Sequence, residues 1–134
     1  MKRIRAEIGH VGRLRAREIG PLRIRTLVRR MGGMSASFWH LAMQPNTSHP
    51  ALLHRKTEEF LFVIGGSARA VINGERCRLR RGSFAFLPRG AAHQFHAGSK
   101  GTEVLALFVP ALDLNNPDIA PVAARRSRRG LGRT

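Results

Sequence analysis

Two histidines and one glutamate in this chain have the types and spacing of a metal site. Four residues separate His54 from Glu59, and His93 follows later in the chain. Glu59 opens the apolar run "EFLFVIG", which is typical of a buried strand. A carboxylate inside a protein is costly unless a positive charge compensates it, and a divalent cation does so. Two imidazoles and a carboxylate form the facial triad of non-haem iron(II) enzymes, and zinc accepts such ligands together with water.

The same three side chains also fit arrangements without metal. His54 and His93 could hydrogen-bond Glu59 in a satisfied buried polar cluster. His54 and Glu59 could instead work together as an acid–base pair. Both readings stay open at this point.

The elements that must position these residues are short apolar segments separated by turn residues. Asn73-Gly74 is a typical hairpin turn, and further glycines follow most of the other segments. No stretch shows a helical period. The pattern predicts an all-β sandwich or barrel, with strands in "PALLHR", "EFLFVIG", "SARAVI", "RCRLR", "SFAFLP", "HQFHA" and "EVLALFV".

Arginine alternates with apolar residues near the start of the chain. The alternation runs from Arg13 to Arg17 and again from Leu22 to Arg30, with the turn-prone Gly20-Pro21 between the two runs. A period of two predicts strands with one solvated, basic face. A further strand is predicted in "SASFWHLAM", residues 35–43.

The spacing of the histidines and the glutamate resembles that of the cupin superfamily. In the family's first motif, a histidine is followed after three or four residues by glutamate and then, after six more, by glycine. His54, Glu59 and Gly66 stand at these positions. The motif has another histidine two residues before His54, and this position is Leu52 here.

The second cupin motif lies further along the chain. It runs glycine, five residues, Pro-x-Gly, two residues, histidine, three residues, asparagine. Gly82, Pro88, Gly90 and His93 match it, and Ala97 replaces the final asparagine. The resemblance covers about residues 35–110.

The resemblance implies a double-stranded β-helix, or jelly-roll barrel, with additional N-terminal strands. We expect residues 35–112 to form the barrel and residues 1–34 to supply strands that pack on it or on a dimer partner. Residues 113–134 should form an extension with a disordered basic tail. Cupins of this type often pair through N-terminal strands, so a homodimer that uses "LRIRTLV" is expected.

The resemblance also implies site residues. The metal ligands would be His54, Glu59 and His93, with iron, manganese, zinc or nickel as candidate ions. The expected substrate pocket contains four further residues, which are Trp39, His40, Leu52 and Phe95. A buried position is expected for Cys77. Most phenylalanines are expected to build the core, with one or two at the pocket mouth, namely Phe60, Phe62, Phe84, Phe86 and Phe95.

The expected function is that of a small-molecule-binding cupin. As a metal-dependent enzyme it would perform oxygenase, isomerase, decarboxylase or lyase chemistry, and its arginines favour an anionic organic substrate. The alternative is a non-catalytic ligand-binding or sensory cupin with a degenerate or empty metal site. The fold alone does not choose among these functions.

The composition limits the partners and the location. Lys and Arg number 24 against 8 acids, a net charge of +16, which attracts polyanions without specificity. The chain contains no tyrosine and no helix-turn-helix signal, so we expect no specific binding of nucleic acid. No apolar run approaches the roughly 18 residues of a membrane span. A single cysteine excludes an internal disulfide, and a cytoplasmic location is expected.

Overall fold

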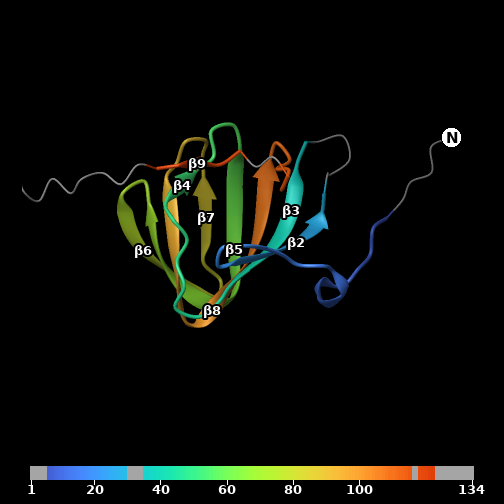
Figure 1. Cartoon of the computed structure of the whole chain (residues 1–134), viewed down its shortest axis with the longest axis horizontal. Coiled ribbons are helices and arrows are strands. Elements are labelled where there is room, and N and C mark those ends of the chain that lie inside the picture. Colours follow the sequence, from blue (N-terminus) through green and yellow to red (C-terminus); the bar gives the residue numbers. More distant parts are fainter. Residues whose placement is uncertain (1–5, 30–34, 116–117, 123–134) are drawn as a thin grey trace, which may run out of the picture.

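The computed structural model describes residues 6–29, 35–115 and 118–122, and its strands curl into a barrel (Figure 1). A short 3-10 helix, η1, spans Val11–Arg13. The strands in chain order are β1 (Arg17–Ile19), β2 (Leu22–Val28), β3 (Ser37–Met43), β4 (Leu52–Leu53), β5 (Glu58–Ile72), β6 (Glu75–Arg80), β7 (Phe84–Leu87), β8 (His93–Val109) and β9 (Ala120–Pro121).

Two long antiparallel strands, β5 and β8, run through both halves of the barrel. In what we call the wide sheet, the first half of β5 pairs with β7 and with the second half of β8, which continues to β3, β2 and β1. In the narrow sheet, the second half of β5 pairs with β6 and with the first half of β8, which continues to β4 and β9. This is the all-β architecture expected for a jelly roll.

Two glycine-rich stretches predicted as turns lie inside these long strands. Gly65-Gly66 lies within β5, and residues 98–101 lie within β8. The register between the two strands shifts beside Gly66, so the glycines act as bulges that bend each strand from one sheet into the other. Asn73-Gly74 does form the predicted hairpin turn, with positive φ at both residues.

The N-terminal segment is strand only in part. The strand predicted from Arg13 begins at Arg17, because the chain before it forms η1, which the His10 side chain caps by accepting a hydrogen bond from Gly12 N–H. Strand β2 lies within the predicted second strand and pairs with β3 of its own chain. The proposed disordered tail lies outside the described residues from position 123 onward.

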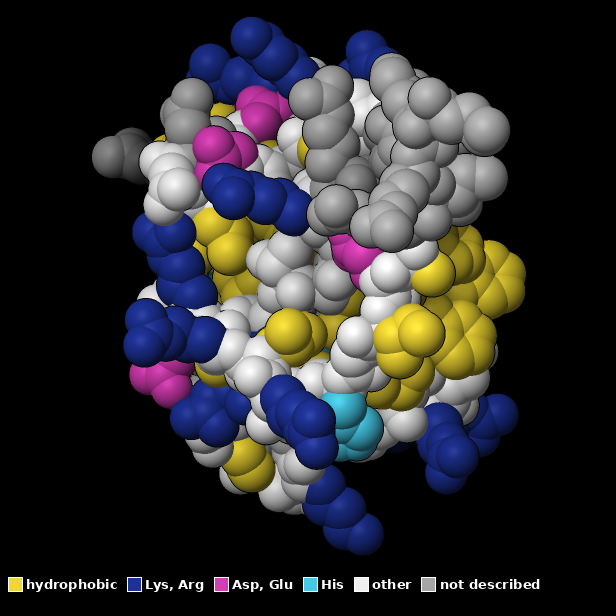
Figure 2. Space-filling model, turned by 90° about the vertical axis from the view of Figure 1, so that its right-hand side faces the viewer, with side chains coloured by type: hydrophobic (Ala, Val, Ile, Leu, Met, Phe, Trp, Pro, Cys, Tyr) yellow, Lys and Arg dark blue, Asp and Glu magenta, His cyan; other side chains and the backbone are white. Residues whose placement is uncertain are grey.

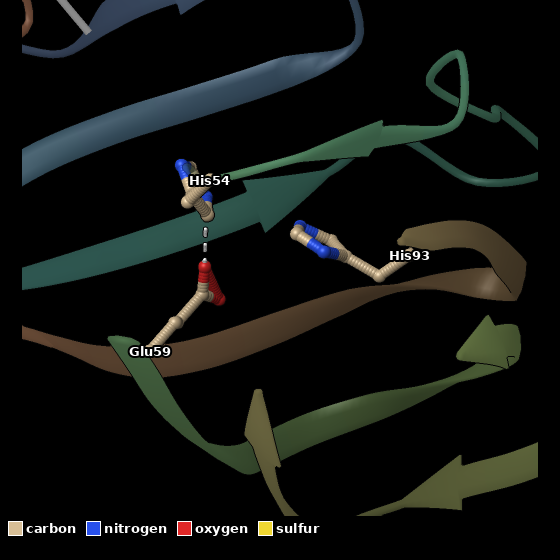
Figure 3. A group of neighbouring side chains, drawn as sticks. All are labelled: His54, Glu59 and His93. Carbon is tan, nitrogen blue, oxygen red and sulfur yellow. Dashed lines mark ion pairs between the residues drawn. The ribbon is translucent and has the colours of Figure 1, made fainter. Parts of the chain in front are cut away.

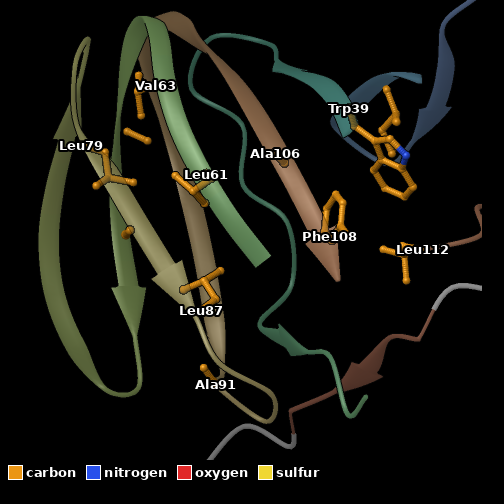
Figure 4. Close-up of a cluster of buried hydrophobic side chains, with 12 residues drawn as sticks. Trp39, Leu61, Val63, Leu79, Leu87, Ala91, Ala106, Phe108 and Leu112 are labelled. Carbon is orange, nitrogen blue, oxygen red and sulfur yellow. The ribbon is translucent and has the colours of Figure 1, made fainter. Parts of the chain in front are cut away.

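The core lies between the two sheets (Figure 4). Leu61 and Val63 of β5 pack there with Leu79 of β6, all nearly inaccessible to solvent. Trp39 of β3 and Phe108 of β8 extend the core across the wide sheet, with ring centroids 4.5 Å apart. Burying each side chain of this size stabilises the fold by about 1.5–3 kcal/mol.

Several apolar residues expected in the core lie at the surface instead. Leu61 and Val63 point inward, so their neighbours on β5 must point outward. Cys77 is also exposed, because it lies near the hairpin end of β6, although Leu79 on the same face is buried. The exposed phenylalanines are Phe60, Phe62, Phe84 and Phe86.

No helix in the described part of the chain has the length and apolar character required to cross a bilayer.

Candidate metal centre

Three elements bring His54, Glu59 and His93 together inside the barrel (Figure 3). His54 directly follows β4, Glu59 is the second residue of β5, and His93 is the first residue of β8. One candidate ligand atom from each residue lies within 4.8 Å of the other two. The three residues are between 4% and 6% exposed, so the group is shielded from bulk water.

Backbone carbonyl groups fix the orientation of both imidazoles. His54 Nδ1 lies 2.8 Å from the carbonyl oxygen of Asp118, and His93 Nδ1 lies 3.0 Å from that of Ala91. A carbonyl oxygen can only accept, so each Nδ1 carries the hydrogen. Each neutral ring therefore has its lone pair on Nε2, as metal-binding histidines commonly do when a carbonyl group holds the other nitrogen.

Glu59 forms a buried ion pair with His54. Glu59 Oε1 lies 3.4 Å from His54 Nε2. Burial alone would lower the pKa of His54, but the Glu59 carboxylate and the carbonyl group of Asp118 outweigh it and raise this pKa above its ordinary value. Without metal, Glu59 therefore makes the imidazolium form of His54 more stable than it is in a free histidine. A metal ion would have to displace that proton.

His93 and a further histidine, His49, are held neutral. Burial lowers the pKa of His93, although the negative charge of Glu59 opposes this. Burial likewise lowers the pKa of His49, whose ring centroid lies 6.2 Å from that of His93. His49 Nε2 accepts a hydrogen bond from the Phe95 backbone N–H at 3.1 Å, and Nδ1 donates to the Pro50 carbonyl group at 2.7 Å. Both nitrogens of His49 are occupied, so it offers no lone pair to an ion.

A cavity of about 240 Å³ opens beside the three residues. Its walls come mainly from β1 to β4, from β8 and from the segment that follows β8, with Glu59 of β5 at one side. Apart from His54, His93, Glu59 and His49, its lining residues are apolar or glycine. The apolar lining includes Leu22, Ile24, Trp39, Leu41, Leu52, Phe95, Phe108, Leu112, Leu114 and Ile119.

Three of the four residues expected in the substrate pocket line the cavity, and the fourth does not. Trp39, Leu52 and Phe95 line the cavity. His40 is absent from the lining, because adjacent residues of β3 face opposite sides of the sheet. Its Nε2 instead lies 3.1 Å from Glu103 Oε2.

Two features of the site were not predicted from the sequence. His49 lines the cavity, but its spacing from the other histidines matches no ligand pattern. The Asp118 carbonyl group holds His54 across a long stretch of chain. Every residue carries such a carbonyl group, so the sequence contains no signal for this contact.

The three residues could hold a divalent metal ion, and one of their separations can be compared with that of bound ligands. Ligands bound at about 2.1 Å to one ion lie about 3.0–3.4 Å apart at octahedral or tetrahedral angles. The 3.4 Å between His54 Nε2 and Glu59 Oε1 lies at the upper end of this range. It is too long for a strong hydrogen bond between the two side chains.

The curated relatives are partial matches. The chain is 28% identical over 96 residues to the tetracenomycin polyketide synthase protein TcmJ of Streptomyces glaucescens, covering 69% of this chain and 64% of that protein. It is 38% identical over 53 residues to an uncharacterized protein of Streptomyces coelicolor, covering 40% of this chain and 50% of that protein. The chain thus spans about half to two thirds of the length of these relatives.

Solved structures share the fold at low sequence identity. Ectoine synthase from P. lautus superposes with a TM-score of 0.74 at 17% identity, covering 91% of this chain and 94% of that one. KdgF from Halomonas sp. gives 0.72 at 14% identity, covering 81% and 97%. A B. subtilis oxalate decarboxylase variant gives 0.70 at 19% identity, covering 88% and 34%. These likenesses confirm the jelly-roll fold.

The family follows from a match over most of the barrel. The cupin domain profile matches residues 39–110, more than half of the chain. This range contains the three candidate ligands and both strands that bend between the sheets. The chain belongs to the cupin family.

Proposed function

We propose that this protein is a metal-dependent cupin enzyme that acts on a small organic molecule in the cavity beside His54, Glu59 and His93. The observation that carries the proposal is the convergence of three buried ligand atoms within 4.8 Å at the wall of a cavity of about 240 Å³. Three protein ligands would leave positions for a substrate or for oxygen. An enzymatic role agrees with the names of two fold relatives, ectoine synthase and oxalate decarboxylase.

A bound divalent ion would act as a Lewis acid on an oxygen atom of the substrate. The chain's own residues would orient and shield the substrate. The carbonyl groups of Asp118 and Ala91 hold the two imidazoles with Nε2 facing inward. Trp39 and Phe108 form an apolar wall that excludes water, which strengthens the electrostatic interactions within the site.

The lining of the cavity narrows the substrate class. No Lys or Arg is among the described residues that line it, so the arginine-rich rim expected for an anionic substrate does not reach this space. A carboxylate or other anionic group on the substrate would therefore have to bind the ion itself. At about 240 Å³ the cavity is slightly smaller than the roughly 300–1,000 Å³ of typical ligand pockets. We propose a small, largely apolar substrate with one metal-binding oxygen group.

Elemental analysis of purified protein tests the proposal. We expect about one equivalent of iron, manganese, nickel or zinc in the wild type, and its loss in His93→Ala because a ligand is removed. His96→Ala is the matched control, since His96 lies on the same strand and outside the cavity lining, and it should keep the metal. Stoichiometric metal in His93→Ala would refute the assignment.

One observation favours a second candidate, a non-catalytic ligand-binding or sensory cupin. His54 and Glu59 form an ion pair, and Nδ1 of each imidazole has a carbonyl partner, so the charge of Glu59 has a partner without an ion. Protein that stays free of metal after incubation with each candidate ion, yet binds small molecules in the cavity, would support this alternative.

The single cysteine agrees with a reducing compartment, and we propose a cytoplasmic location on this ground.

A further inference from the structure

A second hollow, which we call the basic hollow, lies on the outer face of the narrow sheet. Three arginines line it, namely Arg69 of β5 and Arg76 and Arg78 of β6, and β8 adds Gln94 and His96. Its volume is about 700 Å³, which falls within the roughly 300–1,000 Å³ of typical ligand pockets. The basic hollow therefore has the size of a small-molecule site, and it has the cations that the cavity beside the candidate metal centre lacks.

Three nitrogen-bearing side chains form a row across the floor of the basic hollow. In the strand pairing, Arg69 lies opposite Arg78 of β6 on one side and opposite His96 of β8 on the other. Neighbouring strands are about 4.8 Å apart, so the backbones of Arg78 and His96 are about 10 Å apart with Arg69 between them. An anionic group bound above Arg69 would therefore be within reach of all three side chains.

No acidic side chain faces these cations from the same strand segments. Residues 67–80 and 93–98 contain a single acid, Glu75. Alternation along β6 places Glu75 on the opposite side of the strand from Arg76 and Arg78. None of the three arginines of the basic hollow forms an ion pair with a described residue.

Other basic residues of the surface do have acidic neighbours. Figure 2 shows Asp and Glu side chains among the Lys and Arg side chains on the side of the molecule where β2 lies in Figure 1. Arg23 of β2 pairs with Glu18 at 2.9 Å, and Arg89 lies 3.8 Å from Glu58. The basic hollow lacks such partners within the described part of the chain, so an anion from outside can neutralise its cations.

Ser48 holds one end of the row in place. Its Oγ is hydrogen-bonded to Nδ1 of His96, and the two residues also form an isolated β-bridge. No described residue is hydrogen-bonded to Nε2 of His96. Because the ring is already held by one nitrogen, binding a ligand through the other nitrogen costs little side-chain entropy.

The basic hollow is separate from the candidate metal centre. Successive residues of β8 face opposite sides of the sheet, so His93 and Phe95 line the cavity and Gln94 and His96 line the basic hollow. Among the described residues, none lines both spaces. A ligand of the basic hollow would therefore bind whether or not a metal ion is present.

We propose that the basic hollow binds an organic phosphate, a small molecule with two or more negative charges. Guanidinium groups bind phosphate oxygens through paired hydrogen bonds, and Arg69 lies at the centre of the row. Val71, which is 39% exposed, lies opposite Gln94 beside the row and offers a contact surface for the organic part. Nucleic acid is a poorer partner, because the lining includes no Phe, Trp or Tyr on which bases could stack.

Isothermal titration calorimetry with adenosine diphosphate at about 0.1 M ionic strength tests this proposal. We expect the wild type to bind it at least about tenfold more tightly than adenosine, which has no phosphate. Arg69→Thr should raise the dissociation constant of adenosine diphosphate at least about tenfold, because charge-assisted hydrogen bonds are lost. Arg69→Lys should recover only part of this loss, because an ammonium group does not form the paired hydrogen bonds.

Arg15→Thr is the matched control. Arg15 is exposed, forms no ion pair with a described residue and lies outside the lining of the basic hollow. This variant loses the same charge, and its dissociation constant should change less than about twofold, because a distant exposed charge is largely screened.

Four outcomes would overturn the proposal. The wild type would bind neither adenosine diphosphate nor inorganic pyrophosphate. Arg69→Thr and Arg15→Thr would weaken binding equally, which would mean attraction by net charge alone. Arg69→Thr would bind like the wild type, which would place the ligand elsewhere, for example at the metal centre. Random-sequence duplex DNA would displace adenosine diphosphate from the wild type at physiological salt, which would assign this face to nucleic acid. Circular dichroism checks the fold of each variant, and Arg78→Thr replaces Arg69→Thr if the latter does not fold.

Discussion

Leu52 determines how many protein ligands an ion at this centre would have. Its Cα is paired with that of His93 across β4 and β8, and it lies two residues before His54, on the same side of the chain. Leu52 also lines the cavity. Where the cupin motif places a histidine, this chain therefore places an apolar wall beside the position left for a substrate.

Replacing this side chain should restore a fourth ligand. We expect Leu52→His to bind Zn²⁺ or Fe²⁺ at least about tenfold more tightly, which corresponds to about 1.4 kcal/mol or more. Competition titration with a chelator of known affinity measures the change. Leu53→His is the control, because Leu53 faces the opposite side of the chain and lines a different hollow. Equal tightening in both variants would show that Leu52 does not face the ion.

At the scale of the elements, β5 bends at Gly66. The bend lets one strand carry Glu59 in the wide sheet and also form the hairpin with β6 in the narrow sheet. Gly66 has a φ of +66°, and an added Cβ would overlap the carbonyl oxygen of Gly101 on β8. The two strands approach here as closely as backbone allows. A side chain at this position would push β5 and β8 apart at the point where both leave one sheet for the other.

Gly66→Ala should therefore destabilise the whole barrel. Backbone strain of about 1–2 kcal/mol and overpacking of about 1–3 kcal/mol together predict a loss of about 3 kcal/mol. Urea unfolding followed by the fluorescence of Trp39, which is buried, measures it. Gly74→Ala is the control, since its φ is +81° but its Cβ would meet no atom within 4 Å, and it should cost only about 1 kcal/mol. Similar losses in both variants would mean that close contact at Gly66 is unimportant.

The sequence predicted the barrel and the three converging residues because both depend on spacing along strands. The period of two and the turn residues indicated strands, and the cupin motif selected His54, Glu59 and His93. The long strands β5 and β8 were predicted as four short ones, because glycine marks a bulge as readily as a turn.

The sequence did not predict which phenylalanines would be buried. Strand β5 is apolar on both faces over residues 60–64, so its alternation carries no signal for inside and outside. Only the position of β5 between two neighbours in the folded sheet distinguishes Leu61 from Phe60. The same holds for the Asp118 carbonyl group, whose contact with His54 depends on how the chain after β8 returns to the barrel.

At the scale of the whole molecule, the narrow sheet places positive charges directly beside one another. Arg69 lies directly opposite Arg78 in the β5–β6 pairing and opposite His96 in the β5–β8 pairing. Like charges at directly opposed positions destabilise a sheet. The net charge of +16 adds repulsion across the whole surface. The fold therefore carries an electrostatic cost that salt should reduce.

Screening should stabilise the protein, and removing one of the opposed charges should have part of the same effect. The Debye length falls from about 30 Å at 0.01 M to about 3 Å at 1 M ionic strength, so the melting temperature should rise with salt. At low salt, Arg69→Thr should increase the free energy of unfolding by about 0.5 kcal/mol, and this gain should disappear at high salt. Arg89→Thr removes an equal charge but breaks the pair with Glu58, so it should give a smaller gain or none. Urea unfolding at both ionic strengths measures these changes in the free energy of unfolding. Equal gains in both variants would show that the net charge alone, rather than the opposed Arg69–Arg78 pair, causes the electrostatic destabilisation.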